Sequence, residues 1–168
     1  YKMAKRYSTV TVTPTIVKAA FDNNDVIGDF NRLPLPVRDG ESCLLKSITV
    51  VDTEHTGANL DIIFVKNTSG DTELGTSGDA VDITDANLRT NTLLGHVALK
   101  LNGSDLVTGE VGTTTDINLV LTSSVDQTIT DHETAQTGCF FGIIARAASD
   151  TSGGSNDHLT FTFGFEIF

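Results

Sequence analysis

The last eleven residues, 158–168, alternate apolar side chains with polar or small ones at a period of two. One side of this pattern holds five apolar residues, Leu159, Phe161, Phe163, Phe165 and Ile167. Successive side chains of a β-strand point to opposite faces of a sheet, so the pattern predicts a half-buried strand. We therefore expect an all-β fold in which function belongs to loops, edges and faces.

Other segments repeat this alternation or form short apolar runs, and together they predict about eight strands. The expected strands cover residues 6–17, 44–52, 60–65, 93–101, 116–122, 138–147 and 159–168, with short β pieces and crossing loops over 26–40. In the strand at 44–52, we expect Leu44, Ile48 and Val50 to share a face. A short helix is expected near 84–91, with Thr84 or Asp82 as its N-cap.

These elements predict an antiparallel two-sheet sandwich of jelly-roll type, with a closed barrel as the alternative. A chain of 168 residues is long enough to fold without a disulfide or a metal. We expect one β-sandwich domain over 1–168, with residues 1–8 as a candidate N-terminal arm. Cys43 and Cys139 lie in apolar strand patterns and are expected to be buried thiols.

The formal charge of −11 argues against nucleic-acid binding and against binding to anionic membranes, because phosphate groups would be repelled. No stretch approaches the roughly 20 apolar residues that a spanning helix needs. The acidic surface is expected to favour solubility or to contact a basic partner.

Three groups of acidic residues invite a chemical interpretation. Asp61, Asp116 and Glu166 are expected on outward strand positions, where two carboxylates would suit a glycosidase, but a solvated face explains them better. The acidic segment 71–85 suggests calcium, but turn formation and helix capping explain it better, and the adjacent triplet 131–133 reads as an exposed polar loop. We expect no enzyme, no catalytic residue, no bound metal and no cofactor.

Several segments resemble a family of tailed-bacteriophage virion proteins, and the likeness extends over most of the chain. The segments are Val12-Thr13-Pro14-Thr15, Asn24-Asp25-Val26-Ile27-Gly28-Asp29, Ser47-Ile48-Thr49-Val50-Val51-Asp52, Leu60-Asp61-Ile62-Ile63-Phe64 and Ile83-Thr84-Asp85-Ala86-Asn87-Leu88. Asn24 stands where the family pattern has a glycine.

This resemblance implies a capsid decoration, or cement, protein, assembled in the host cytoplasm. Such a protein binds the outer surface of the virion head and bridges major capsid protein subunits as a homotrimer. The alternative is a carbohydrate- or receptor-binding β-sandwich module of a phage tail or head fibre. The absence of tryptophan speaks against that alternative, because sugar sites usually use exposed aromatic side chains.

The expected partner contacts lie near the two ends of the sequence. The threonine-rich strand near the start has Pro14, which cannot donate to a ladder, so it is expected at a sheet edge where it could join a neighbour's sheet. The alternative is that it pairs only within its own sheet. Phe168 breaks the polarity of its strand face and is expected to be buried against a partner or a loop. The interface residues that we predict are Lys5, Arg6, Tyr7, Thr9, Thr11 and Phe168.

Overall fold

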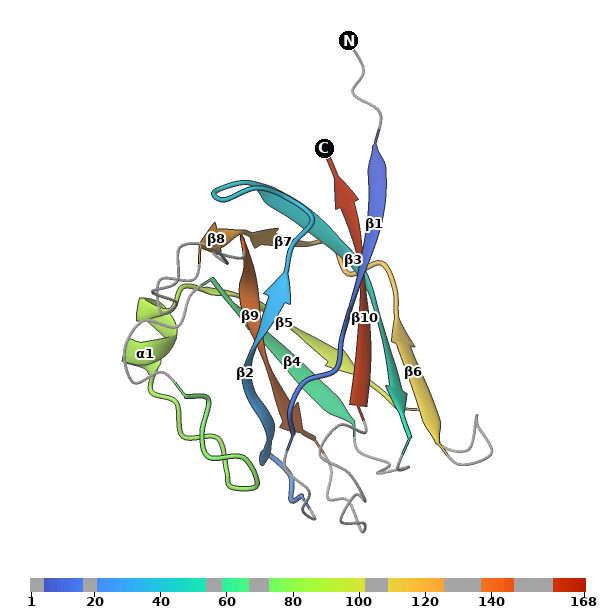
Figure 1. Ribbon diagram of the computed structural model, residues 1–168. Coiled ribbons are helices and arrows are strands. Elements are labelled where there is room, and N and C mark those ends of the chain that lie inside the picture. The colour runs from blue at the N-terminus through green and yellow to red at the C-terminus, as the bar shows by residue number, and fades with distance from the viewer. Residues whose placement is uncertain are drawn as a thin grey trace.

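The computed structural model describes residues 5–16, 21–53, 59–66, 73–101, 109–125, 137–146 and 159–168. These residues form ten strands and one short helix, arranged as two antiparallel sheets (Figure 1). The first sheet contains β1 (Arg6–Val12), β10 (Leu159–Ile167), β3 (Ser42–Asp52), β6 (Glu110–Thr114) and β7 (Leu119–Thr122). The second sheet contains β2 (Val26–Pro34), β9 (Thr137–Ala145), β4 (Leu60–Val65), β5 (Leu93–Leu99) and β8 (Ser124–Val125). The predicted all-β sandwich is confirmed.

The connectivity is that of a jelly roll. The first strand pairs with the last, β2 pairs with β9, β3 with β6 and β4 with β5, all antiparallel. The chain thus resembles one long hairpin that is wrapped so that its strands fill two sheets, in the orders β1-β10-β3-β6 and β2-β9-β4-β5. Jelly rolls of this kind occur in viral capsid proteins, lectins and cupins. Two separate sheets also decide for the sandwich over the closed barrel.

The number of strands exceeds eight because one jelly-roll position is interrupted. Both β6 and β7 pair with β3, along Ile48–Asp52 and Ser42–Leu45 respectively. Between them, Asp116 and Asn118 have φ of 59° and 45°, which a strand cannot contain. The strand expected at 116–122 therefore begins only at Leu119. β8 adds a further two-residue pairing beside β9.

The sequence prediction did not include β6, and several strand boundaries differ from it, most of all those of β1 and β2. β1 ends at Val12 instead of continuing to residue 17; Pro14, two residues later, has no N–H for a ladder. Residues 26–34 form one nine-residue strand, β2, instead of short β pieces and loops. The pairing of β2 with β9 shifts register twice, and such bulges hide a strand from a simple period-two pattern.

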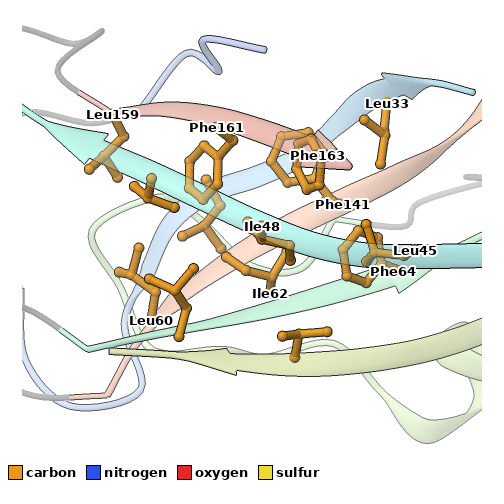
Figure 2. Close-up of a cluster of buried hydrophobic side chains, with 14 of the residues drawn as sticks. Leu33, Leu45, Ile48, Leu60, Ile62, Phe64, Phe141, Leu159, Phe161 and Phe163 are labelled. Atoms are coloured by element: carbon orange, nitrogen blue, oxygen red, sulfur yellow. The ribbon is translucent and has the colours of Figure 1, made fainter. Parts of the chain in front are cut away.

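Phenylalanine side chains fill the space between the sheets (Figure 2). Phe161 and Phe163 come from β10 in the first sheet, and they meet Phe64 and Phe141 from the second sheet. The ring centroids of Phe141 and Phe163 are 5.1 Å apart and the rings meet edge to face, an arrangement that is favourable for aromatic pairs. All four side chains are fully buried, so the C-terminal alternation was interpreted correctly.

The outer faces of the two sheets differ. A second, small apolar cluster covers part of the outer face of the second sheet: Leu74 packs with Val26 and Ile144, and Val81 and Ile83 pack against them. The Leu74 N–H donates to Asp29 Oδ1 at 2.8 Å, which holds this covering segment to β2. On the first sheet, by contrast, most outward side chains are exposed or half-buried. The outer face of the first sheet is therefore the candidate interaction surface.

The predicted short helix is confirmed as α1 (Asp85–Thr90), which follows the covering segment. Thr84 is its N-cap: the threonine Oγ1 accepts a hydrogen bond from the Asn87 N–H at 3.2 Å, and Asp85 adds a negative charge near the positive end of the helix dipole. Within the described ranges, no helix is long and apolar enough to cross a membrane.

The turn that precedes β2 explains the asparagine at position 24. Asn24 has φ of 77°, a left-handed conformation that glycine adopts most easily and asparagine tolerates better than most residues. Asp25 closes the turn, since its Oδ2 accepts from the Asp22 N–H at 2.7 Å. At Gly28 the side chains of Ile16 and Ile143 lie close to the backbone. A Cβ at this position would be 3.2 Å from Cγ2 of Ile16 and 3.3 Å from Cδ1 of Ile143.

Candidate interaction surface

The strand β1 occupies one edge of the first sheet. Among the described strands it pairs with β10 alone, in a register without shifts from Arg6 opposite Ile167 to Val12 opposite Phe161. The predicted edge position is therefore confirmed. Of the expected arm, residues 6–8 belong to this strand and residues 1–4 lie outside the described residues.

The structure gathers the predicted interface residues at β1 and the adjacent end of β10 (Figure 1). Each has an exposed side chain: Lys5, Arg6, Tyr7, Thr9, Thr11 and Phe168. Phe168 is 65% exposed, so it is not buried against a loop of its own chain. That these residues contact a partner stays a prediction.

Lys5 forms an ion pair within its own chain. Its Nζ lies 2.5 Å from Oε1 of Glu166 on β10. The hydrogen bond to Glu166 and the charge of that carboxylate raise the pKa of Lys5. Glu166 is buried rather than solvated as the sequence predicted, and Lys5, which directly precedes β1, supplies the counter-charge that makes this burial tolerable. Arg6 is exposed, and alternation places it on the opposite face of β1 from Lys5 and Tyr7.

A row of apolar side chains crosses the outer face at this end of the sheet. Tyr7 on β1 lies opposite Glu166 on β10, which lies opposite Leu44 on β3, which in turn lies opposite Val120 on β7. Tyr7 is 72% exposed and Val120 is 54% exposed. Phe168 follows β10 directly at the same end. We call Tyr7, Leu44, Val120 and Phe168 the apolar row.

Further along the same face, hydroxyl groups replace the apolar side chains. Thr11, Thr162, Thr49 and Thr113 lie opposite one another across four strands. The hydroxyls of Thr11 and Thr162 are 3.1 Å apart and those of Thr49 and Thr113 are 3.2 Å apart. Such cross-strand threonine pairs stabilise a sheet, and this part of the face is polar and uncharged.

The acidic residues weighed for glycoside hydrolysis do not meet in a common site. Asp61 is on β4 in the second sheet and Glu166 is on β10 in the first. Asp61 is buried and its Oδ2 lies 2.5 Å from Nε of Arg146, so the expected solvated position is wrong for it as well as for Glu166. Asp116 lies in the turn between β6 and β7 instead of on a strand.

In the acidic segment, Asp85 lies in the first turn of α1, and the Asp79 N–H closes a turn by donating to the Thr76 carbonyl at 3.0 Å. Glu73, Asp79, Asp82 and Asp85 fall within the described residues, whereas Asp71 and the triplet 131–133 lie outside them. Among the residues that the structure describes, no three His, Cys, Asp or Glu side chains are grouped to hold a metal ion.

Both cysteines are free and buried in the core, as expected. Burial raises the pKa of the Cys43 thiol to about 11. Burial, and to a lesser extent the neighbouring Cys43, raises the pKa of Cys139 further. A thiol that stays protonated is a poor nucleophile, so these groups act as small apolar side chains.

Two members of the apolar row, Leu44 and Val120, were absent from the predicted interface. A register shift between Gly164 and Phe165 in the β10–β3 ladder inverts the alternation along β3. As a result Leu45 faces the core with Ile48 and Val50, while Leu44 faces outward. The signal for Val120 was available: it lies between Leu119 and Leu121, so that short strand is apolar on both faces.

Comparison with models of protein families finds no match, and comparison with curated protein sequences finds none either. Among solved structures, a chain from a crystal structure of the T13 IBDV viral particle, which is said to reveal a missing link in the evolution of icosahedral viruses, is similar at 15% sequence identity with a TM-score of 0.36. The alignment covers 97% of this chain and 31% of that one. The protein thus spans about a third of the length of the virus chain. A likeness at this level assigns neither family nor function.

Proposed function

We propose that the protein is a non-enzymatic structural component of a virion, which binds the outer surface of the head and stabilises contacts between major capsid protein subunits. The observation that carries the proposal is the apolar row. Three of its side chains are more than half exposed, and the strand register places the row on the outer face of the first sheet, where most of the described outward side chains are exposed or half-buried. Contiguous exposed apolar side chains with a polar surround mark protein–protein contact sites.

The composition of this surface suits a protein partner. Tyr7 and Phe168 supply aromatic side chains, which often dominate binding energy at interfaces. The row of threonines further along the face provides an uncharged surround. Arg6 is an exposed cation on the same strand, although alternation places its side chain on the opposite face from Tyr7. The fold and the motifs quoted above agree with a virion protein. Because a jelly roll hosts many functions, the proposal rests on the exposed apolar row and not on the fold.

The mechanism is thermodynamic linkage. A protein that binds the assembled shell but not its separated subunits stabilises the shell, by about 2.7 kcal/mol per site at a free concentration 100 times the dissociation constant. Where several copies act as one body, each contact raises the effective concentration of the next. Binding therefore opposes rupture of the shell by the packaged genome.

The test compares exposed apolar residues inside and outside the row. Purified protein is added to undecorated heads, and bound protein is measured by co-sedimentation together with the temperature of genome release. We expect Tyr7→Ser combined with Phe168→Ser to weaken binding about tenfold or more, since each aromatic contact is worth about 1 kcal/mol or more. Leu93→Ser is the matched control, because Leu93 is 50% exposed but lies on β5 in the second sheet.

Two outcomes would contradict the proposal. One is wild-type protein that neither binds heads nor raises the release temperature. The other is binding by the row variants that equals that of wild type. Binding to glycans without affinity for heads would support the carbohydrate-binding alternative instead.

A further inference from the structure

Three of the four sheet edges formed by the described strands have features that oppose pairing with another strand. The β6–β7 edge is interrupted at 115–118 by the two residues with positive φ. The β2 edge shifts register twice, and at its start Asp25 is bridged to Ala80 of the covering segment. The β5 edge includes Gly95 at φ 154° and belongs to a ladder with a register shift next to Val65. Broken, bulged or covered edges protect sheets from adding strands.

The fourth edge, β1, has none of these features in its described part. Its seven residue pairs with β10 follow one another without a shift. From Tyr7 to Val12 the sequence contains no charged residue, no proline and no glycine, and threonine and valine favour extended structure. A straight, uncharged edge strand is the kind that pairs with another chain.

We propose that β1 pairs antiparallel with β1 of a second copy of this chain, about a twofold axis at Thr9. This register places Thr9 opposite the partner's Thr9 and Tyr7 opposite the partner's Thr11. The first sheet of one copy then continues into the first sheet of the other, in the order β6-β3-β10-β1-β1-β10-β3-β6. Identical surfaces meet, as in most closed homodimers.

The charges of β1 are compatible with self-pairing in this register. Arg6 lies opposite the partner's Val12 and Lys5 opposite the partner's Thr13, so no two like charges face each other. Lys5 is in addition neutralised by Glu166 within its own chain. Facing like charges would oppose pairing.

The contacts across the axis repeat contacts that the sheet already makes. Facing threonines lie with their hydroxyls 3.1 Å apart at Thr11 and Thr162 and again at Thr13 and Thr160. The facing Thr9 side chains would extend this chemistry, and the exposed Tyr7 ring would cover the partner's Thr11. Aromatic and β-branched side chains are favourable cross-strand pairs.

This inference does not depend on the proposed function, and it is tested on the isolated protein. Sedimentation velocity over a concentration series should show a monomer–dimer equilibrium for wild type. Thr9→Lys and Thr9→Glu each place two like charges in contact at the axis, so each should weaken dimerisation about fivefold, the upper end for such a facing pair. A mixture of the two variants should recover association, because Lys then faces Glu. Thr113→Lys, exposed on the same face but on β6, should dimerise like wild type.

Cysteine crosslinking tests the register itself. Under oxidation Thr9→Cys should form an intermolecular disulfide, because only residue 9 faces its own copy, whereas Thr11→Cys, which faces Tyr7, should crosslink far less. The native cysteines are buried in the core and do not compete. A wild-type protein that stays monomeric, or that forms the trimer implied by the resemblance, would overturn the proposal. So would equal crosslinking at positions 9 and 11, or undiminished dimerisation of Thr9→Lys.

Discussion

Asp61 and Arg146 form an ion pair that joins β4 to the end of β9, with Oδ2 and Nε 2.5 Å apart. The guanidinium also donates to the Oδ1 of Asn24, so the pair connects the turn before β2 to two strands of the second sheet. Asp61 is 8% exposed, and a carboxylate at such a depth needs a partner. The pair is therefore structural, and it explains an acidic residue inside an otherwise apolar strand.

Removal of Arg146 should destabilise the fold. Arg146→Gln leaves the buried carboxylate of Asp61 without its counter-charge, and we expect a loss of about 1–3 kcal/mol in the free energy of unfolding. Urea denaturation measures this loss. Lys100→Gln removes an exposed cation and should change stability by less than about 0.5 kcal/mol. If the two variants were equally stable, the pair would have no structural role.

Truncation of a core phenylalanine should have a larger effect. Phe163 contacts the rings of Phe64 and Phe141 across the sandwich and that of Phe161 on its own strand, and Phe163→Ala should cost about 3–5 kcal/mol. This can approach the whole stability of a domain, so Phe163→Leu, which removes fewer buried atoms and should cost less, keeps the measurement possible. Phe168→Ala is the control, since an exposed ring contributes little to folding. A large loss for Phe168→Ala would mean that the C-terminal residue packs into the fold.

The sequence predicted the parts of the fold in which alternation is undisturbed. The pattern over Leu159–Ile167 is regular, and burial along β10 follows it as far as Phe165, whereas Glu166 is buried beside Lys5. The pattern fails where a ladder shifts register, because one extra residue moves every later side chain to the other face. This is why β2 was predicted only as short β pieces and why Leu44 was assigned to the wrong face of β3.

Only the part of the candidate surface that lies on a regularly alternating strand could be predicted from the sequence. β1 is regular, so Tyr7, Thr9 and Thr11 could be placed on the open face of an edge strand from their spacing alone. Long-range pairs could not be found in this way: the partner of Lys5 is Glu166, and the partner of Tyr7 in the apolar row is Val120. Only the register of four strands brings these residues together.

The native thiols should react slowly. Cys43 and Cys139 are buried and burial raises both pKa values, so a thiol reagent at pH 8 should label neither in the folded protein and both in urea. The labelling rate then reports opening of the core. Rapid labelling of the native protein would show that the core opens readily near Cys43 or Cys139.

The contribution of Lys5 to stability should disappear at high pH. Interaction with Glu166 raises the pKa of Lys5 above its ordinary value of 10.5. Because the folded state binds this proton more tightly than the unfolded state, the contribution is complete below pH 10.5 and is lost as the pH rises through the folded pKa. The difference in unfolding free energy between wild type and Lys5→Met should thus be constant from pH 7 to 9 and shrink above pH 10.5. Lys46→Met serves as the control for general alkaline effects, and a Lys5→Met difference that persists at the highest pH would mean that packing of the lysine stem, rather than its charge, holds β1 to β10.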